Sequence, residues 1–179
     1  MPTILTHPAV PLAIGLGLGS GIVPRRLLVA GVIASIVPDF DVIGFQFGVP
    51  YGSEFGHRGF THSLVFAAGL ALLGCFVARW LRASVVATFL FLFAAAASHG
   101  VLDSFTNGGY GIAFLWPFSV ERFFAPFQVI EVSPIGVSRF LSARGIAVFA
   151  SELLWVWLPA ALLAMLLTIL RRRSIPASS

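Results

Sequence analysis

The residues that could carry chemistry in this chain are its four histidines and three aspartates, and all of them lie at ends of apolar segments. If those segments cross a membrane alternately, all seven side chains fall on the same face. Imidazole and carboxylate groups together are the ligand set of zinc and related transition metals. The sequence therefore predicts a metal site at one surface of a membrane protein, with these candidate ligands: His7, Asp39, Asp41, His57, His62, His99 and Asp103.

The most informative spacing is that of His99 and Asp103, which are four residues apart and share one face of a helix. Asp39 and Asp41 alternate after Pro38, so in an extended turn they point to opposite sides. One of them could bind the metal while the other orients a histidine. We expect direct ligands at Asp41, His62, His99 and Asp103, and further ligands or supporting groups at Asp39, His57 and His7.

The segment His57–Ser63 places two histidines around the start of the third apolar segment. We expect His57 in the loop and His62 in the first helical turn, with Thr61 as the N-cap. A helix N-terminus also favours an anion such as phosphate. Arg58, and in second place Arg122, are the candidate substrate-binding residues because guanidinium groups recognise phosphate well.

Two acidic residues are candidates for catalysis, Asp39 and Glu152. Glu152 lies near the start of the last apolar segment, on the face of the other candidates. It is either an acid stabilised by the helix dipole or a further ligand or base. We expect solvated loop charges at the remaining acids, Glu54, Glu121 and Glu131.

The composition excludes an ordinary soluble domain. The 179 residues are 58% hydrophobic and 10% charged, whereas soluble domains carry about 25% charged residues. All eleven cations are arginines beside apolar runs, which topology and anionic lipids explain better than nucleic acid. The single cysteine, Cys75, excludes an internal disulfide and is expected to be a packing residue.

We predict an all-α integral membrane bundle in a single membrane domain, residues 1–179. Its five hydrophobic helices are predicted at 9–23, 27–37, 63–81, 84–102 and 146–170, with Pro38 ending the second. Residues 1–103 would hold the metal-site helices, and 104–145 an aromatic-rich loop at the lipid interface. Residues 146–170 would form the last membrane helix, followed by a basic cytoplasmic tail at 171–179.

Arginine placement predicts the orientation. Three clusters would fall on the cytoplasmic side by the positive-inside rule: Arg25 and Arg26, Arg79 and Arg82, and Arg171 to Arg173. The opposite side carries Arg58, Arg122, Arg139 and Arg144, mostly in the long loop, where the rule is weaker. The metal site is accordingly expected on the outer face of the membrane, towards the periplasm or the cell exterior.

Several of these motifs together resemble the YdjM-type membrane-bound metal-dependent hydrolases of bacteria. They are His7, Pro38-Asp39-Phe40-Asp41, the segment His57–Ser63, the His99/Asp103 pair, and the later Gly109-Tyr110-Gly111 and Leu115-Trp116-Pro117-Phe118. That family is distantly similar to zinc-dependent phospholipase C and nuclease P1, in which His and Asp hold several zinc ions. The resemblance implies a hydrolase with zinc, or alternatively manganese. No histidine follows His99, so one or two ions are expected rather than three.

These observations predict a metal-dependent hydrolase that acts on a small-molecule or lipid phosphoester at the membrane surface. The expected partners are membrane lipid and that substrate, with no nucleic acid. A non-catalytic metal-binding membrane protein, either a transporter or an envelope scaffold, is the alternative. The apolar segments are nearly free of polar residues between their ends, which favours a surface site over a transport path.

Overall fold

The computed structural model describes residues 1–133 and 142–173. Part of the predicted loop, including Arg139, and the end of the predicted tail lie outside the described residues. Within the described part, the chain forms a helical bundle without a regular strand, and two isolated β-bridges occur between residues 106 and 130. The predicted all-α membrane bundle is confirmed.

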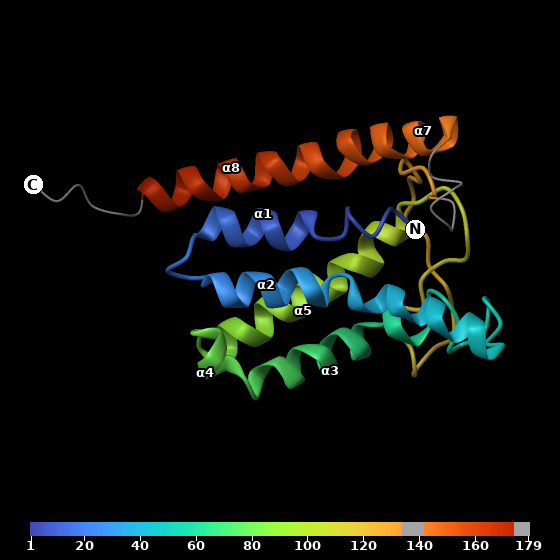
Figure 1. Cartoon of the computed structure of the whole chain (residues 1–179), viewed down its shortest axis with the longest axis horizontal. Coiled ribbons are helices and arrows are strands. Elements are labelled where there is room, and N and C mark those ends of the chain that lie inside the picture. Colours follow the sequence, from blue (N-terminus) through green and yellow to red (C-terminus); the bar gives the residue numbers. More distant parts are fainter. Residues whose placement is uncertain (134–141, 174–179) are drawn as a thin grey trace, which may run out of the picture.

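The helices follow the predicted apolar segments and run back and forth along one axis (Figure 1). The element bounds are α1 Ala9–Leu18, α2 Arg25–Ala34, the 3-10 helix η1 Val37–Phe47, the short 3-10 turn η2 Phe60–His62, α3 Leu64–Cys75, α4 Ala78–Leu81, α5 Val85–Ser104, α7 Ala143–Glu152, the π-helical turn η3 Leu153–Trp157, and α8 Leu158–Arg173.

Three continuous helical stretches are long and apolar enough to cross a membrane: Arg25–Phe47, Val85–Ser104 and Ala143–Arg173. Two shorter apolar helices, Ala9–Leu18 and Leu64–Cys75, lie beside them. A span needs about 20 apolar residues, so η1 gives the second segment the length that α2 lacks. The five predicted segments therefore all correspond to helices, two of them shorter than a full span.

Small residues allow these helices to approach closely. The main helix pairs are α3 with α5 and α1 with α8. A Cβ atom on Gly17 of α1 would lie 2.6 Å from the Cβ of Leu167 in α8. In a membrane the apolar solvent supplies little driving force between helices, so such close contact is a main source of attraction. The glycine-rich first segment thus serves as the packing surface for α8.

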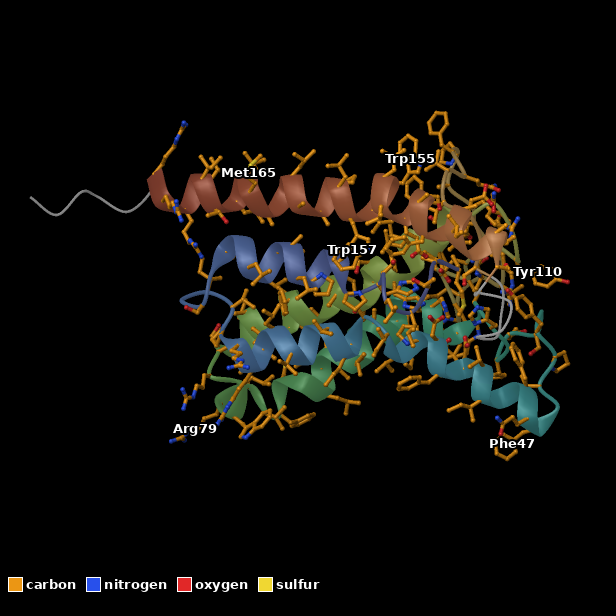
Figure 2. All side chains as sticks on the ribbon, turned by 45° about the horizontal axis from the view of Figure 1, so that its top comes forward. Phe47, Arg79, Tyr110, Trp155, Trp157 and Met165 are labelled. Atoms are coloured by element: carbon orange, nitrogen blue, oxygen red, sulfur yellow. The ribbon has the colours of Figure 1, made fainter. Side chains whose placement is uncertain are left out.

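The last helix presents most of its other surface to lipid. Side chains such as Trp155 and Met165 point away from the bundle, whereas Trp157 lies on the side of α1 (Figure 2). Trp155 and Met165 are 50% and 56% exposed. The π-helical turn at Leu153–Trp157 lies between α7 and α8, a kind of local widening that is frequent at functional sites.

Two local predictions were wrong. Pro38 does not end the second segment in an extended turn; it stands in the first turn of η1, and Asp39 and Asp41 lie on this 3-10 helix. Proline fits there because the first N–H groups of a helix have no partner within it. Thr61 is not the N-cap of the third segment: Ser63 is, its Oγ accepting a hydrogen bond from Phe66 N, and His62 belongs to the preceding 3-10 turn.

The bundle has two chemically different ends. The N-terminal residues, the loop 48–63 and the loop after α5 gather at one end, shown on the right in Figure 1. The turn between α1 and α2, helix α4 and the end of α8 lie at the other. All seven acids and all four histidines belong to the first end, while Arg25, Arg26, Arg79, Arg82 and Arg171 to Arg173 belong to the second.

Candidate metal centre

All seven predicted ligand residues come together at the first end of the bundle. Their side chains are 0% to 2% exposed. They arrive from four places in the chain: the segment before α1, helix η1, the stretch 57–62, and the end of α5. We refer to these residues as the His/Asp cluster: His7, Asp39, Asp41, His57, His62, His99 and Asp103.

Two groups within the cluster have donor atoms close enough to hold an ion. Asp39, His57, His62 and Asp103 form the first group, and His7, His99 and Asp103 form the second. Within each group the candidate ligand atoms all lie within 4.8 Å of one another. Because Asp103 belongs to both groups, its two carboxylate oxygens could serve two neighbouring ions.

The hydrogen bonds of the histidines fix which nitrogen carries a lone pair. His99 Nδ1 lies 2.7 Å from the carbonyl oxygen of Ser35 and must donate to it, because a carbonyl only accepts. His57 Nδ1 likewise donates to Asp41 Oδ1 at 2.7 Å. In the neutral rings this leaves the Nε2 atoms as acceptors, the form in which imidazole binds metals.

His62 is oriented in the same way by its neighbour. The Thr61 hydroxyl donates to Asp41 Oδ2 at 2.8 Å, so its oxygen accepts from His62 Nδ1 at 3.0 Å. His62 Nε2 then presents a lone pair. Asp41 therefore orients His57 directly and His62 through Thr61, the supporting arrangement typical of metal-bound histidine.

The acceptors that remain converge on a small volume. His62 Nε2 lies 3.1 Å from His99 Nε2 and 3.4 Å from Asp103 Oδ2. His99 Nε2 lies 3.3 Å from Asp39 Oδ1. Two ligands that each lie about 2.0–2.2 Å from a zinc ion are separated by no more than roughly 4.4 Å. These distances are therefore compatible with nitrogen and oxygen atoms that bind the same metal ion.

The cluster is also short of positive charge and of hydrogen-bond donors. Both carboxylate oxygens of Asp39 and of Asp103, and both ring nitrogens of His7, are buried without a hydrogen-bond partner. Of the three buried carboxylates, only that of Asp103 pairs with a guanidinium in the described part of the chain, that of Arg58. Uncompensated buried charge is costly, so the donor set fits one or two divalent cations.

The surroundings keep two of the rings neutral. Burial lowers the pKa of His7 to about 3, and the nearby imidazole of His99 acts in the same direction. Burial also lowers the pKa of His62, although the Asp103 carboxylate opposes this. A histidine must be neutral to bind a metal, and both rings meet that condition at pH 7.

Asp39 and Asp41 divide the two roles that the sequence left open. Asp39 contributes to the first group of ligand atoms and lies 3.6 Å from His7 Nε2. Asp41 belongs to neither group and instead binds His57 and Thr61. The sequence analysis expected a direct ligand at Asp41 and a further ligand or supporting group at Asp39; the donor-atom geometry includes Asp39 and leaves out Asp41.

Arg58 lies inside the cluster, fully buried, with its Nε 3.3 Å from Asp103 Oδ2. Its terminal nitrogens donate to the carbonyl oxygens of Gly108 and Tyr110 and to the Thr106 hydroxyl. Its donors are thus directed at the protein. In this arrangement Arg58 fixes Asp103 and ties the loop after α5 to the cluster.

Arg122 lies at the edge of the site and links three backbone segments. It donates to the carbonyl oxygens of His57, Gly111, Gly52 and Ser53. Burial lowers its pKa, but arginine remains charged at any physiological pH. It also lines a cleft of about 440 Å³ with Glu54 and Trp116. This cleft gives the end of the molecule that carries the cluster an opening beside the backbone of His57.

Glu152 is buried but directs its carboxylate at the N-terminal segment. It accepts hydrogen bonds from the backbone N–H and hydroxyl of Thr3 and from the hydroxyl of Thr6, the last at 2.7 Å. Trp157 Nε1 also donates to Thr6 Oγ1 at 3.3 Å. Thr6 directly precedes His7. Glu152 and Trp157, at the junction of α7 and the π-helical turn, therefore fix the N-terminal segment that positions His7 in the cluster.

The other acids stay outside the cluster. Glu54 accepts from Trp116 Nε1 at 3.2 Å, and Glu131 pairs with Arg144 in the open, with side chains 37% and 52% exposed. The sequence analysis missed three supporting groups: Thr61, Thr6 and the carbonyl of Ser35. Thr61 and Thr6 are each adjacent to a histidine, which is a usable signal, whereas a backbone carbonyl leaves no trace in the sequence.

Comparison with known proteins agrees with this picture. The family model described as YdjM inner membrane protein matches residues 1–175. The chain is 56% identical over 173 residues to the inner membrane protein YbcI of Escherichia coli strain K12. The alignment covers 96% of this chain and 100% of the relative. No solved structure matches significantly.

Proposed function

The chain belongs to the YdjM family of inner membrane proteins. From the geometry of the His/Asp cluster we propose that it is a membrane-bound metal-dependent hydrolase acting on a phosphoester or lipid-like substrate. The observation that carries the proposal is the convergence of His62, His99, Asp39 and Asp103 as buried acceptors with too few donors. Such a donor set suits zinc, with manganese as the second choice.

A divalent ion held there would supply Lewis-acid chemistry, by lowering the pKa of a water molecule and polarising a phosphoryl oxygen. The residues of this chain perform the supporting tasks. Asp41 keeps His57 and His62 in the metal-binding tautomer, Arg58 fixes Asp103, and the loop after α5 holds Arg58 through two backbone carbonyl groups. Asp39 has both oxygens unpartnered and is the chain's candidate to accept a proton.

The position of the centre supports the proposed substrate class. The His/Asp cluster lies at the first turn of η1 and at the end of α5, close to the headgroup level at one face of a membrane that these helices cross. The cleft beside Arg122 and Trp116 combines a cation with an aromatic ring at that level, which suits a phosphate attached to an apolar body. The arginine-rich opposite end favours a periplasmic position for the cluster by the positive-inside rule.

A second function is favoured by one observation, the closure of the cluster. Catalytic zinc sites keep an open coordination position, whereas structural ones are closed, and the cluster side chains are at most 2% exposed. The alternative is therefore a non-catalytic metal-binding membrane protein.

The two functions are separated by one assay on the purified protein loaded with zinc or manganese. Hydrolysis of bis(p-nitrophenyl) phosphate and of inner membrane phospholipids is measured for the wild type, for His62→Ala, and for Glu131→Gln as a control outside the cluster. The proposal predicts metal-dependent turnover that falls at least about a hundredfold in His62→Ala only. Bound metal without hydrolysis of either substrate class would reject the hydrolase and support the alternative.

A further inference from the structure

A cleft at the arginine-rich end of the bundle is used by nothing described so far. It has a volume of about 740 Å³ and lies between the turn joining α1 to α2, the first half of α2, and α4. Arg25, Arg26 and Arg82 line it, together with apolar side chains of α2 that include Val29 and Ile33. The α1–α2 turn and helix α4, which border this cleft, lie at the opposite end of the molecule from the N-terminal residues (Figure 1).

The charge around this cleft is uniformly positive. Seven of the eleven arginines lie in residues 25–26, 79–82 and 171–173, and all the acids of the chain lie elsewhere. In the part of the chain that the structure describes, the guanidinium groups of Arg25 and Arg82 show no hydrogen bond or ion pair. Both side chains are exposed, so their donors are available to an anion.

The third arginine forms a fixed wall of the cleft. Arg26 Nη1 donates to the carbonyl oxygen of Trp80 at 2.9 Å, and its guanidinium carbon lies 5.0 Å above the Trp80 ring. This contact holds α4 against the start of α2. Trp80 is 63% exposed, and tryptophan at a helix end is typical of the headgroup level of a membrane. Arg79 of the same helix marks this end in Figure 2.

The apolar wall of the cleft continues towards the membrane centre. Ala30 and Ile33 line both this cleft and a second hollow of about 300 Å³ between α2 and α3, which reaches Val37. From Arg25 to Val37 a helical path measures roughly 18 Å at 1.5 Å per residue. Half of the hydrocarbon core of a bilayer is about 15 Å, so the two hollows together extend over one leaflet.

We propose that this cleft binds an anionic phospholipid of the leaflet on the arginine side. The phosphate lies between Arg25 and Arg82, and an acyl chain follows Val29 and Ile33 along α2. Basic pockets between membrane helices are suited to anionic headgroups. The apolar wall lies within the spanning stretch Arg25–Phe47 and so faces acyl chains, which favours a lipid over a peptide or a soluble anion.

The test is native mass spectrometry of the detergent-purified full chain titrated with phosphatidylglycerol or with phosphatidylcholine of the same acyl chains. The variant Arg25→Gln/Arg82→Gln removes two charges from the cleft. Arg79→Gln/Arg172→Gln removes two charges from the same end of the bundle without touching the residues that line it. The wild type is expected to bind phosphatidylglycerol in preference to phosphatidylcholine. Only Arg25→Gln/Arg82→Gln is expected to bind phosphatidylglycerol more weakly than the wild type, by about tenfold or more.

Equal weakening in both variants would show attraction to the charged surface alone and overturn the proposal, as would equal binding of the two lipids. Ile33→Trp is a second test variant. It fills the space along the apolar wall without changing charge, so it should weaken the binding of both lipids. Metal content, which depends on the opposite end of the molecule, checks that each variant is folded. The outcome does not depend on whether the His/Asp cluster hydrolyses anything.

Discussion

The Nε2 atoms of His62 and His99 face each other at 3.1 Å, and in the neutral rings each carries a lone pair. A shared proton could satisfy this one contact. It would leave the carboxylates of Asp39 and Asp103 without hydrogen-bond donors, whereas divalent cations in the two ligand groups would satisfy all four side chains. The pair therefore links the tautomers set by Ser35 and Thr61 to the capacity of the cluster to hold a metal ion.

Metal stoichiometry should depend on which group of ligands is altered. His7 belongs only to the second group, while Asp103 belongs to both. If the two groups hold an ion each, Asp103→Asn should lose both ions and His7→Ala should retain one. Elemental mass spectrometry of protein equilibrated at limiting zinc measures this, with Ser98→Ala as a nearby control. Identical losses in the two variants would contradict a shared Asp103 between two ions.

Asp41→Ala should weaken metal binding although Asp41 belongs to neither ligand group. It leaves the Nδ1–H of His57 and the hydroxyl of Thr61 without their acceptor. Loss of such supporting groups typically lowers affinity about 10- to 100-fold. Competition with a chromophoric chelator measures the change. Asp41→Asn should recover part of the lost affinity because its amide oxygen still accepts a hydrogen bond. Gln46→Ala, exposed on the same helix, should have no effect. Full metal affinity in Asp41→Ala would reject the orienting role.

Arg58→Met should destabilise the protein strongly. It removes the partner of buried Asp103 and the donor to Thr106 and two carbonyl groups, and breaking a buried ion pair costs about 3–5 kcal/mol. Thermal unfolding followed by tryptophan fluorescence should shift down by on the order of 10 °C. Arg144→Met, which breaks the exposed pair with Glu131, should cost about 0–1 kcal/mol. Similar shifts in both variants would contradict the structural role of Arg58.

Glu152→Ala should affect the metal group that contains His7 more than the other. Its carboxylate accepts three hydrogen bonds from Thr3 and Thr6, and an unsatisfied buried donor costs about 1–3 kcal/mol. The segment before α1 would loosen and His7 would leave the cluster. We expect one ion to be retained at limiting zinc, as in His7→Ala. Complete loss of metal would contradict this and show that Glu152 supports both ligand groups. Glu131→Ala, the matched control, should keep the metal content of the wild type.

Gly17→Val should separate α8 from α1. A Cβ at residue 17 would lie 2.6 Å from the Cβ of Leu167, a backbone-proximal atom that cannot move aside alone. Overpacking of this kind costs about 1–3 kcal/mol. The thermal unfolding midpoint should fall, whereas Gly69→Val, which meets nothing within 4 Å, should leave it unchanged. A normal midpoint in Gly17→Val would contradict close packing of the two helices.

Hydrophobicity and helical periodicity were sufficient to predict the bundle and the common location of the His/Asp cluster. His99 and Asp103 could be paired because four residues separate neighbours on a helical face. The roles of Asp39 and Asp41 could not be assigned, because the sequence does not distinguish an extended turn after Pro38 from a 3-10 helix that begins there. A proline is compatible with both.

Long-range partners explain the remaining gaps. Glu152 was left open between a cap, a ligand and a base because its partners, Thr3 and Thr6, lie some 146 to 149 residues away in the chain. Arg58 was expected to meet a substrate anion, yet its nearest anion is Asp103 from another helix. Only the packing of α7 and α5 against the N-terminal segment and the loop 48–63 brings these groups together.

The near-complete burial of the His/Asp cluster has a kinetic consequence. An ion among side chains that are at most 2% exposed could leave only when one of the segments that enclose the cluster opens. Chelator-driven release should then proceed at the opening rate, whatever the chelator concentration. A bound ion would accordingly exchange with its surroundings only as often as this end of the bundle opens.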